Sequence, residues 1–224
     1  RGFASQAGRM PSPYLGPGYT AREVEAALAA HARELRWERP AELPERVVDL
    51  LEGGAIVGWF QGRMEFGPRA LGNRSILADP RRPEMKDRVN RAVKKREEFR
   101  PFAPSVTAEA ADAFFHLRDL AQYEHMTVAV RARAERAAEI PAVVHANGSS
   151  RVQVVRREAN PRYWDLLTRM GRRTGVPMVL NTSFNVRGEP IVCSPTDAIR
   201  CFLGTGLDAL VLEDVLVFKT GPEA

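Results

Sequence analysis

The chain has 224 residues, enough for one large domain with a sizeable core, and its 44% hydrophobic share is typical of a folded protein. No apolar run reaches the roughly 18 residues that cross a bilayer, no signal-peptide core follows the N-terminus, and Cys193 and Cys201 form no CxxC pair, so we expect a cytoplasmic protein without a zinc ribbon or disulfide framework. The net charge of +5 favours an anionic partner but does not separate nucleotide, nucleic acid and solvent.

Helices and strands are predicted to alternate along most of the chain. Because the chain begins with Arg1 rather than Met, we expect a fragment of a longer protein. A segment rich in Pro and Gly at residues 10–19 is typical of a linker, and the capping box of Thr20 and Glu23 predicts a helix to about Arg36. Further helices are predicted at residues 44–54, 83–94, 108–116, 161–173 and 194–203. Strands are predicted at residues 55–60, 125–133, 142–145, 151–155 and 177–181, with a closing hairpin at 209–219. This order predicts an α/β fold with a mixed sheet.

The first segment that favours a ligand site is "GRMEFGPRALGNRS" at residues 62–75. Its glycines and proline predict tight turns from which Arg63, Arg69 and Arg74 project. Arginine forks match phosphate oxygens in pairs, and glycine lets the backbone approach an anion. The alternative is a surface loop with solvated arginines. The segment is not a P-loop, because the order GxxxxGK[ST] is absent.

The second segment is "VKKREEFRPFAPSV" at residues 93–106. Four of its first eight residues are basic: Lys94, Lys95, Arg96 and Arg100. Two prolines then force an extended path that a helix cannot follow. A charge run is usually a solvated face, and that reading stays open. Phe102 and the prolines beside it favour a pocket wall.

The third segment is "PMVLNTSFNVRGEP" at residues 177–190, a strand that ends in small hydrogen-bonding groups. Asn181, Thr182, Ser183 and Asn185 can bind a polarised carbonyl or phosphoryl group without moving a proton. We expect "HANGSSRVQ" at residues 145–153 to lie beside it, with Arg151 and Arg187 supplying charge.

No nucleophile or metal motif accompanies these polar segments in the sequence. His145 fits a general base, but a lone histidine at a strand end is more often structural. Neither a Ser/His/Asp order nor HExxH nor a paired acidic motif is present. The composition of the three segments therefore favours group transfer that is stabilised by charge.

The three segments, with "RVQVV" and the flanking "GWFQ" and "SILADPR", resemble the C-terminal, YrdC-like domain of O-carbamoyltransferases of the nodulation, cephamycin and tobramycin type. The resemblance covers roughly residues 53–219. It implies a linker and helical segment at residues 1–52 and a YrdC-like domain at residues 53–224, with a twisted mixed sheet flanked by helices.

The resemblance also implies an activity. In that family the YrdC-like domain takes carbamoyl phosphate and ATP, with Mg²⁺, and makes carbamoyl adenylate. A separate N-terminal, ASKHA-type domain that holds a metal ion then passes the carbamoyl group to a hydroxyl acceptor. No such domain is found in these 224 residues. We therefore expect this chain to form the adenylate and not to complete the transfer.

Site residues follow from the resemblance by position. The KxR pattern of YrdC-like domains falls on Lys94 and Arg96, and the SxN pattern on Ser183 and Asn185. We expect Lys94, Arg96 and Arg69 to be catalytic, and no protein side chain to bind a metal. The residues expected to bind carbamoyl phosphate and ATP are Arg151, Asn181, Ser183, Asn185, Arg63 and Arg74. Where relatives commonly read His-Val-Asp-Gly, this chain has Asn147 in place of the aspartate, which puts an acid or metal role at that position in doubt.

Two other functions stay open. A YrdC-like protein can instead make threonylcarbamoyl adenylate from threonine, bicarbonate and ATP, although the "GPRALGNRS" segment favours the carbamoyltransferase type. A non-catalytic RNA-binding module is the second alternative. Nucleic-acid binders usually interleave aromatic and basic residues, and aromatics make up only 8% of this chain.

Overall fold

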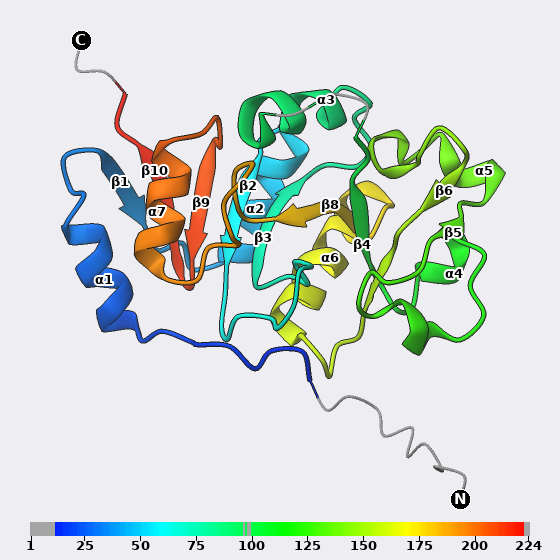
Figure 1. The fold of residues 1–224 in the computed structure, drawn as a ribbon, viewed down its shortest axis with the longest axis horizontal. Helices are drawn as coiled ribbons and strands as arrows, with labels where there is room; N and C mark the ends of the chain where they lie inside the picture. Colours follow the sequence, from blue (N-terminus) through cyan, green and yellow to red (C-terminus); the bar gives the residue numbers. More distant parts are fainter. Residues whose placement is uncertain (1–11, 96, 98–99, 222–224) are drawn as a thin grey trace, which may run out of the picture.

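A large mixed sheet lies at the centre of the structure, with helices on both faces (Figure 1). The computed structural model describes residues 12–95, 97 and 100–221. The sheet consists of β1 (Leu35–Glu38), β2 (Val57–Phe60), β3 (Arg74–Ala78), β4 (Ala103–Thr107), β7 (Gln153–Val155), β8 (Met178–Ser183), β9 (Ala209–Leu212) and β10 (Val215–Lys219). Their order across it is β1-β10-β9-β2-β3-β8-β4-β7. Because β2 is parallel to β9 and β4 to β7 while the other pairs are antiparallel, the expected α/β fold with a mixed sheet is confirmed.

Helices divide between the two faces of the sheet. They are α1 (Ala21–Ala29), α2 (Leu43–Glu52), α3 (Met85–Val89), α4 (Ala111–Phe114), α5 (Ala134–Ala137), α6 (Pro161–Thr174) and α7 (Pro195–Leu203). Apolar residues of α1, α3 and α7 share one core cluster, and those of α2 and α6 share another. Successive side chains of β2 point to opposite faces of the sheet. Trp59 therefore belongs to the cluster of α2 and α6, and Phe60 to the cluster of α1, α3 and α7.

The helix boundaries expected from local signals are largely confirmed. The Thr20 and Glu23 side chains form the capping box that begins α1. Ser194 caps α7 in the same way with Asp197, and Pro195 occupies the first turn, where its missing N–H costs nothing. In α6 the helix ends at Gly175, which adopts a left-handed conformation with φ of 77°.

The expectation of a helix continuing to Arg36 is wrong. The helix ends at Ala29, and Leu35–Glu38 forms β1, which pairs with the edge of β10. Leu35 lies seven residues after Leu28, so its apolar side chain fits the helical period as well as a strand. Pairing with β10 decides between these two conformations, which a local pattern cannot show.

Two expected strands are also corrected. Within residues 125–133 only Val130–Arg131 forms a strand, β5, which pairs with β6 (Ser149–Ser150) in a small second sheet. Met126 has a positive φ of 54°, which interrupts an extended chain. Residues 142–145 do not form a strand either, because a 3₁₀ turn at Pro141–Val143 takes their place.

The segment before residue 53 packs on the same sheet as the rest of the chain. Strand β1 pairs with β10, and α2 packs on α6 in one apolar cluster. The division at residue 52 stays a prediction about domain organisation. In the ranges that the structure describes, no helix is both long and apolar enough to cross a membrane.

Gly72 should be the least replaceable glycine of the loop before β3. Its φ is 103°, and an added Cβ would lie 2.2 Å from Cδ1 of Tyr163. We expect Gly72→Ala to lower the free energy of unfolding by at least about 3 kcal/mol, measured by urea denaturation. Gly67→Ala is the control, because Gly67 has a similar φ of 114° but nothing within 4 Å of the added atom. It should cost only about 1 to 2 kcal/mol, and equal losses would contradict the steric explanation.

Candidate active site

A polar cavity of about 240 Å³ lies at the end of β8. Strand β8 runs between β3 and β4, so that Asn181 pairs with Leu77 on one side and Ala103 on the other. The cavity is lined by Pro68, Arg69, Ala70, Arg100, Pro101, Phe102, Ala103, Met126, Arg151, Asn181, Thr182 and Ser183. The sheet therefore brings parts of all three sequence segments together at the end of its inner strand β8.

Lys94 reaches the end of β8 from a π-helix at Asn90–Lys94 (η1), which follows α3 directly. Such single-turn features are frequent at functional sites. The Lys94 side chain is 4% exposed. Its ammonium donates to Ser183 Oγ at 3.2 Å, to the Ser183 carbonyl, and to Asn185 Oδ1 at 2.8 Å. The buried ammonium thus lies directly behind Ser183, which lines the cavity.

Ser183 and Asn185, which both accept from this ammonium, are also hydrogen-bonded to each other. The Ser183 hydroxyl donates to Asn185 Oδ1 at 2.7 Å, and Asn185 Nδ2 donates to the Glu189 carbonyl at 2.7 Å. The KxR and SxN positions Lys94, Ser183 and Asn185 therefore meet in space. Arg96, the other KxR position, lies outside the described residues.

Three arginines, Arg69, Arg100 and Arg151, line the cavity. Arg151 Nε is buried without a hydrogen-bond partner among the described residues. Burial lowers the pKa of the Arg151 guanidinium, and the charge of Arg69 lowers it further. The repulsion between Arg69 and Arg151 and the unpaired Arg151 Nε–H both cost free energy. An anion bound between the two guanidinium groups would relieve both. Arg100 was not among the expected site residues, although it belongs to the basic run of residues 94–100.

Arg63 and Arg74 lie elsewhere and bind backbone carbonyls. Arg63 is exposed and donates to the carbonyls of Leu15 and Gly16, at 2.7 and 2.9 Å. Arg74 is fully buried, and its guanidinium stacks 3.5 Å from the Phe60 ring centroid. It donates to the carbonyls of Gln61, Asn73, Gly62 and Pro17. Neither side chain lines the cavity, and both connect the loop before β3 to its surroundings.

Glu65 organises the same loop from inside. Its side chain is 2% exposed, and Oε1 accepts the backbone N–H groups of Leu71, Asn73 and Arg74 at 2.6, 3.2 and 3.2 Å. A carboxylate that accepts several backbone donors is a strong acceptor. The backbone of residues 71–74 is therefore held by one buried side chain.

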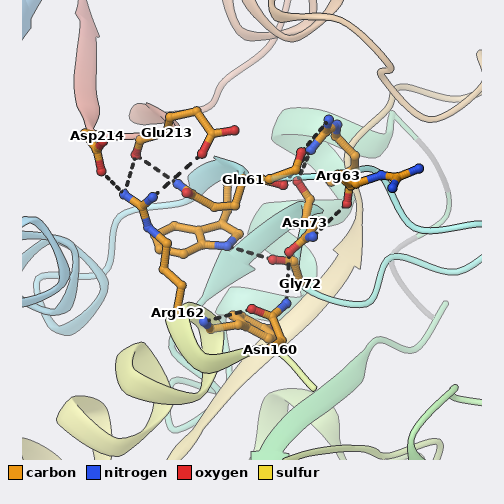
Figure 2. Close-up of polar contacts among 12 residues, drawn as sticks. Gln61, Arg63, Gly72, Asn73, Asn160, Arg162, Glu213 and Asp214 are labelled. Atoms are coloured by element: carbon orange, nitrogen blue, oxygen red, sulfur yellow. Dashed lines mark hydrogen bonds and ion pairs between the residues drawn. The ribbon is translucent and has the colours of Figure 1, made fainter. Parts of the chain in front are cut away.

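Figure 2 shows the polar network that surrounds this loop. The Asn73 side chain donates to the Arg63 carbonyl at 2.7 Å and accepts from Asn160 at 2.9 Å, which ties the loop to the first turn of α6. The indole of Trp59 donates to the Gly72 carbonyl at 2.8 Å. These contacts fix the loop through residues that do not line the cavity.

His145 does not line the cavity, so the structure gives no support to its alternative role as a general base in that cavity. Its Nδ1 lies 3.4 Å from Ser149 Oγ. Burial lowers the pKa of His145, a backbone contact with Phe102 opposes the shift, and the charge of Arg151 adds to it. The neighbouring Asn147 is exposed and accepts from the Ser149 N–H at 3.0 Å. This hydrogen bond within the turn needs only a side-chain oxygen as acceptor, so asparagine and aspartate can both make it at position 147.

Two further features complete this region. Arg187 is exposed and lies 3.8 Å from Glu97, so it belongs to a surface ion pair. Over residues 12–95, 97 and 100–221, no three His, Cys, Asp or Glu side chains gather as metal ligands would.

Arg74→Lys should be strongly destabilising. Lysine cannot reach all the carbonyls that the guanidinium fork binds together, so the Gln61 and Gly62 carbonyls would lose their side-chain donor. The Asn73 and Pro17 carbonyls would keep their backbone N–H donors. We expect the free energy of unfolding to fall by about 2 to 4 kcal/mol in urea denaturation. The matched control is Arg63→Lys at the exposed arginine of the same loop, which should cost less than about 1 kcal/mol. Similar losses in the two variants would contradict the structural role of Arg74.

The lowered pKa of His145 should make stability depend on pH. The unfolded chain takes up the imidazole proton near the ordinary value of about 6.5, and the folded chain does so at lower pH. Stability from this residue is therefore fully present above about 6.5 and declines as the pH falls toward the folded pKa. In urea denaturation at pH 7.5 and at about pH 5.5, His145→Asn should lose less stability than the original chain. An equal loss would show that His145 titrates normally.

Comparison with known proteins agrees with the resemblance seen in the sequence. Residues 48–219 match the family model described as Carbamoyltransferase C-terminus. Nodulation protein NolO of Bradyrhizobium diazoefficiens is 47% identical over 94% of this chain, which spans 39% of that protein. The 3'-hydroxymethylcephem-O-carbamoyltransferase of Amycolatopsis lactamdurans is 37% identical over 80% of this chain, which spans 34% of that protein. The chain thus covers little more than a third of the length of these relatives.

Solved structures share the fold at low sequence identity. HypF of T. kodakarensis aligns with a TM-score of 0.55 at 16% identity, over 81% of this chain and 23% of HypF. A full-length HypF described as phosphate- and nucleotide-bound gives 0.51, also at 16% identity, over 83% of this chain and 22% of that chain. The family model and the curated relatives together show that this chain belongs to the carbamoyltransferase family, in which it matches the C-terminal domain.

Proposed function

We propose that this chain binds ATP and carbamoyl phosphate in the cavity at the end of β8 and forms carbamoyl adenylate there. The observation that supports the proposal most directly is the contact of the buried Lys94 ammonium with Ser183 and Asn185. Arg69 and Arg151 line the same cavity. Phosphoryl transfer needs positioning and positive charge more than a covalent catalyst, and these residues provide both.

The reaction would proceed in two balanced steps. Water would cleave carbamoyl phosphate to carbamate and inorganic phosphate. A carbamate oxygen would then bond to the α-phosphorus of ATP as the bond from that phosphorus to the bridging oxygen of pyrophosphate breaks. Arg69, Arg151 and Lys94 would neutralise the phosphates, while Asn181 and Ser183 would orient the carbamoyl group.

The remaining expected residues have different places in this proposal. Asn185 would act by holding the Lys94 ammonium and the Ser183 hydroxyl. Arg96 stays a predicted catalytic residue. Arg63 and Arg74 would support the loop before β3 from positions outside the cavity lining. Mg²⁺ would enter bound to the triphosphate, whose charge it would offset.

In the longer proteins of this family, we propose that an N-terminal, ASKHA-type domain receives the adenylate and passes the carbamoyl group to a hydroxyl acceptor. The chain spans 34% of the cephem O-carbamoyltransferase, which leaves room for such a domain in that relative. A cytoplasmic location is retained as part of the proposal, because both substrates are phosphorylated metabolites.

Pyrophosphate release with Mg²⁺, ATP and carbamoyl phosphate tests the proposal. Lys94→Met should reduce the rate by on the order of 100-fold, since it removes a buried charge beside the phosphates. Ser183→Ala should reduce it by roughly tenfold through the loss of a hydrogen bond. Arg172→Gln is the control, because Arg172 is an exposed arginine of α6 outside the cavity, and its rate should not change.

Other results would redirect or remove the proposal. Release that depends on threonine and bicarbonate would indicate threonylcarbamoyl adenylate synthesis. RNA binding that weakens steeply with salt, without ATP turnover, would indicate a nucleic-acid module. If calorimetry detects no binding of ATP or carbamoyl phosphate and no pyrophosphate forms, the proposed function is wrong.

A further inference from the structure

The Asn181 side chain has a donor that is fully engaged and an acceptor that is not. Asn181 is 1% exposed and is one of the residues that line the cavity. Its Nδ2 lies near three oxygens: Ala70 O at 3.2 Å, Ser105 Oγ at 2.9 Å and Gln153 Oε1 at 3.1 Å. Its Oδ1 is buried and has no hydrogen-bond partner in the described part of the chain.

Backbone carbonyls determine which way this carboxamide faces. The Ala70 carbonyl can only accept, so it must face Asn181 Nδ2. The Leu71 carbonyl likewise accepts from Gln153 Nε2 at 2.8 Å, which turns Gln153 Oε1 toward Ser105 and Asn181.

Ser105 completes the arrangement between the two amides. Its hydroxyl donates to Gln153 Oε1 at 2.6 Å, so its oxygen is left to accept from Asn181 Nδ2. Turning the Asn181 amide over would place Oδ1 against three oxygen atoms and remove every one of these bonds. The orientation of the amide therefore follows from atoms whose donor or acceptor role is fixed.

We infer that Ser105 and Gln153 are positioning residues that hold the Asn181 oxygen ready to accept an N–H from the ligand in the cavity. The inference rests on the proposed function and adds a source of selectivity to it. A carbamoyl group ends in NH₂ and would satisfy this acceptor. An acetyl group has a methyl in the same place and would leave the buried oxygen unpaired.

The selectivity expected from this arrangement differs from that of the cationic residues. Arg69 and Arg151 attract any phosphorylated ligand, because charge does not distinguish the groups attached to the phosphate. A site built to bond an N–H rejects the analogue without it, because the buried partner stays unsatisfied. Carbamoyl phosphate and acetyl phosphate have the same phosphate and differ at this one group.

Calorimetric titration of the folded chain with carbamoyl phosphate, acetyl phosphate and inorganic phosphate tests the inference. We expect carbamoyl phosphate to bind at least roughly tenfold more tightly than acetyl phosphate. Gln153→Met has a similar volume but cannot accept from Asn181 Nδ2 or from the Ser105 hydroxyl, so the Asn181 amide keeps the Ala70 carbonyl as its only fixed acceptor. That variant should lower the ratio of the two affinities while its affinity for inorganic phosphate stays the same.

A second variant and a matched control keep the result interpretable. Ser105→Ala removes one contact with each amide and should lower the ratio less, which covers the case that Gln153→Met does not fold. Gln61→Met is the control, because Gln61 is also a buried glutamine but its amide donates to the Glu213 carbonyl and takes no part in the hydrogen bonds around Asn181. It should keep the full preference, and a thermal melt of each variant checks that it is folded.

The outcomes separate this inference from the proposed function. Equal affinity of the original chain for carbamoyl and acetyl phosphate would overturn the inference and leave an anion-binding site. No binding of either compound would remove the proposed function and the inference together. A preference that persists in both folded variants would show that Ser105 and Gln153 do not position Asn181.

Discussion

The loop before β3 depends on two buried charges of opposite sign. The Glu65 carboxylate accepts three backbone N–H groups, and the Arg74 guanidinium donates to backbone carbonyls. Burial lowers the pKa of the Arg74 guanidinium, and the charge of Glu65 is the largest influence that opposes the shift. Since burying both charges costs solvation free energy, their hydrogen bonds to the loop must offset that cost.

That same loop supplies two of the fixed points of the cavity. The carbonyls of Ala70 and Leu71 orient Asn181 and Gln153, and Arg69 and Ala70 line the cavity wall. Tyr14 adds a hydrogen bond of 2.9 Å to the Leu71 carbonyl from the N-terminal segment. A shift of the loop backbone would therefore move Asn181 and Gln153 through their hydrogen bonds to the loop, and would also move Arg69. The loop supports the site, while β8 carries Asn181, Thr182 and Ser183 into the cavity wall and β4 begins there at Ala103.

The sequence predicts local structure and cavity composition better than it predicts side-chain partners. The capping box at Thr20 depends on four consecutive residues and forms as expected, and the helix predicted from Ser194 begins there with a capping box of its own. Strands β1, β3 and β4 depend on distant pairing partners, and local patterns missed them. Of the nine expected site residues, Arg69, Arg151, Asn181 and Ser183 line the cavity.

Arg63 and Arg74 show why residue type alone was insufficient. An arginine in a glycine-rich loop can bind an anion or its own backbone, and only burial and neighbouring carbonyls distinguish the two. Gln153 shows the reverse case, because it is the one polar residue in the apolar stretch "VQVV" at residues 152–155. A buried amide in such a strand requires partners, so the pattern contained a signal for a polar network that motif comparison overlooked.

Under the proposed function, the polar end of β8 would combine two kinds of recognition that act on different parts of one ligand. Cations near a phosphate provide affinity, but they bind inorganic phosphate and phosphate esters alike. Discrimination at the uncharged end requires a neutral acceptor in a fixed orientation, because a free amide can turn to offer either its oxygen or its nitrogen. Small polar residues suit this end of the strand because their short side chains have few conformations and are readily fixed by neighbours. Under the proposed function, the buried Asn181 amide and the charged wall would therefore have complementary roles: the charge would provide affinity, and the oriented amide would provide selectivity for the carbamoyl group.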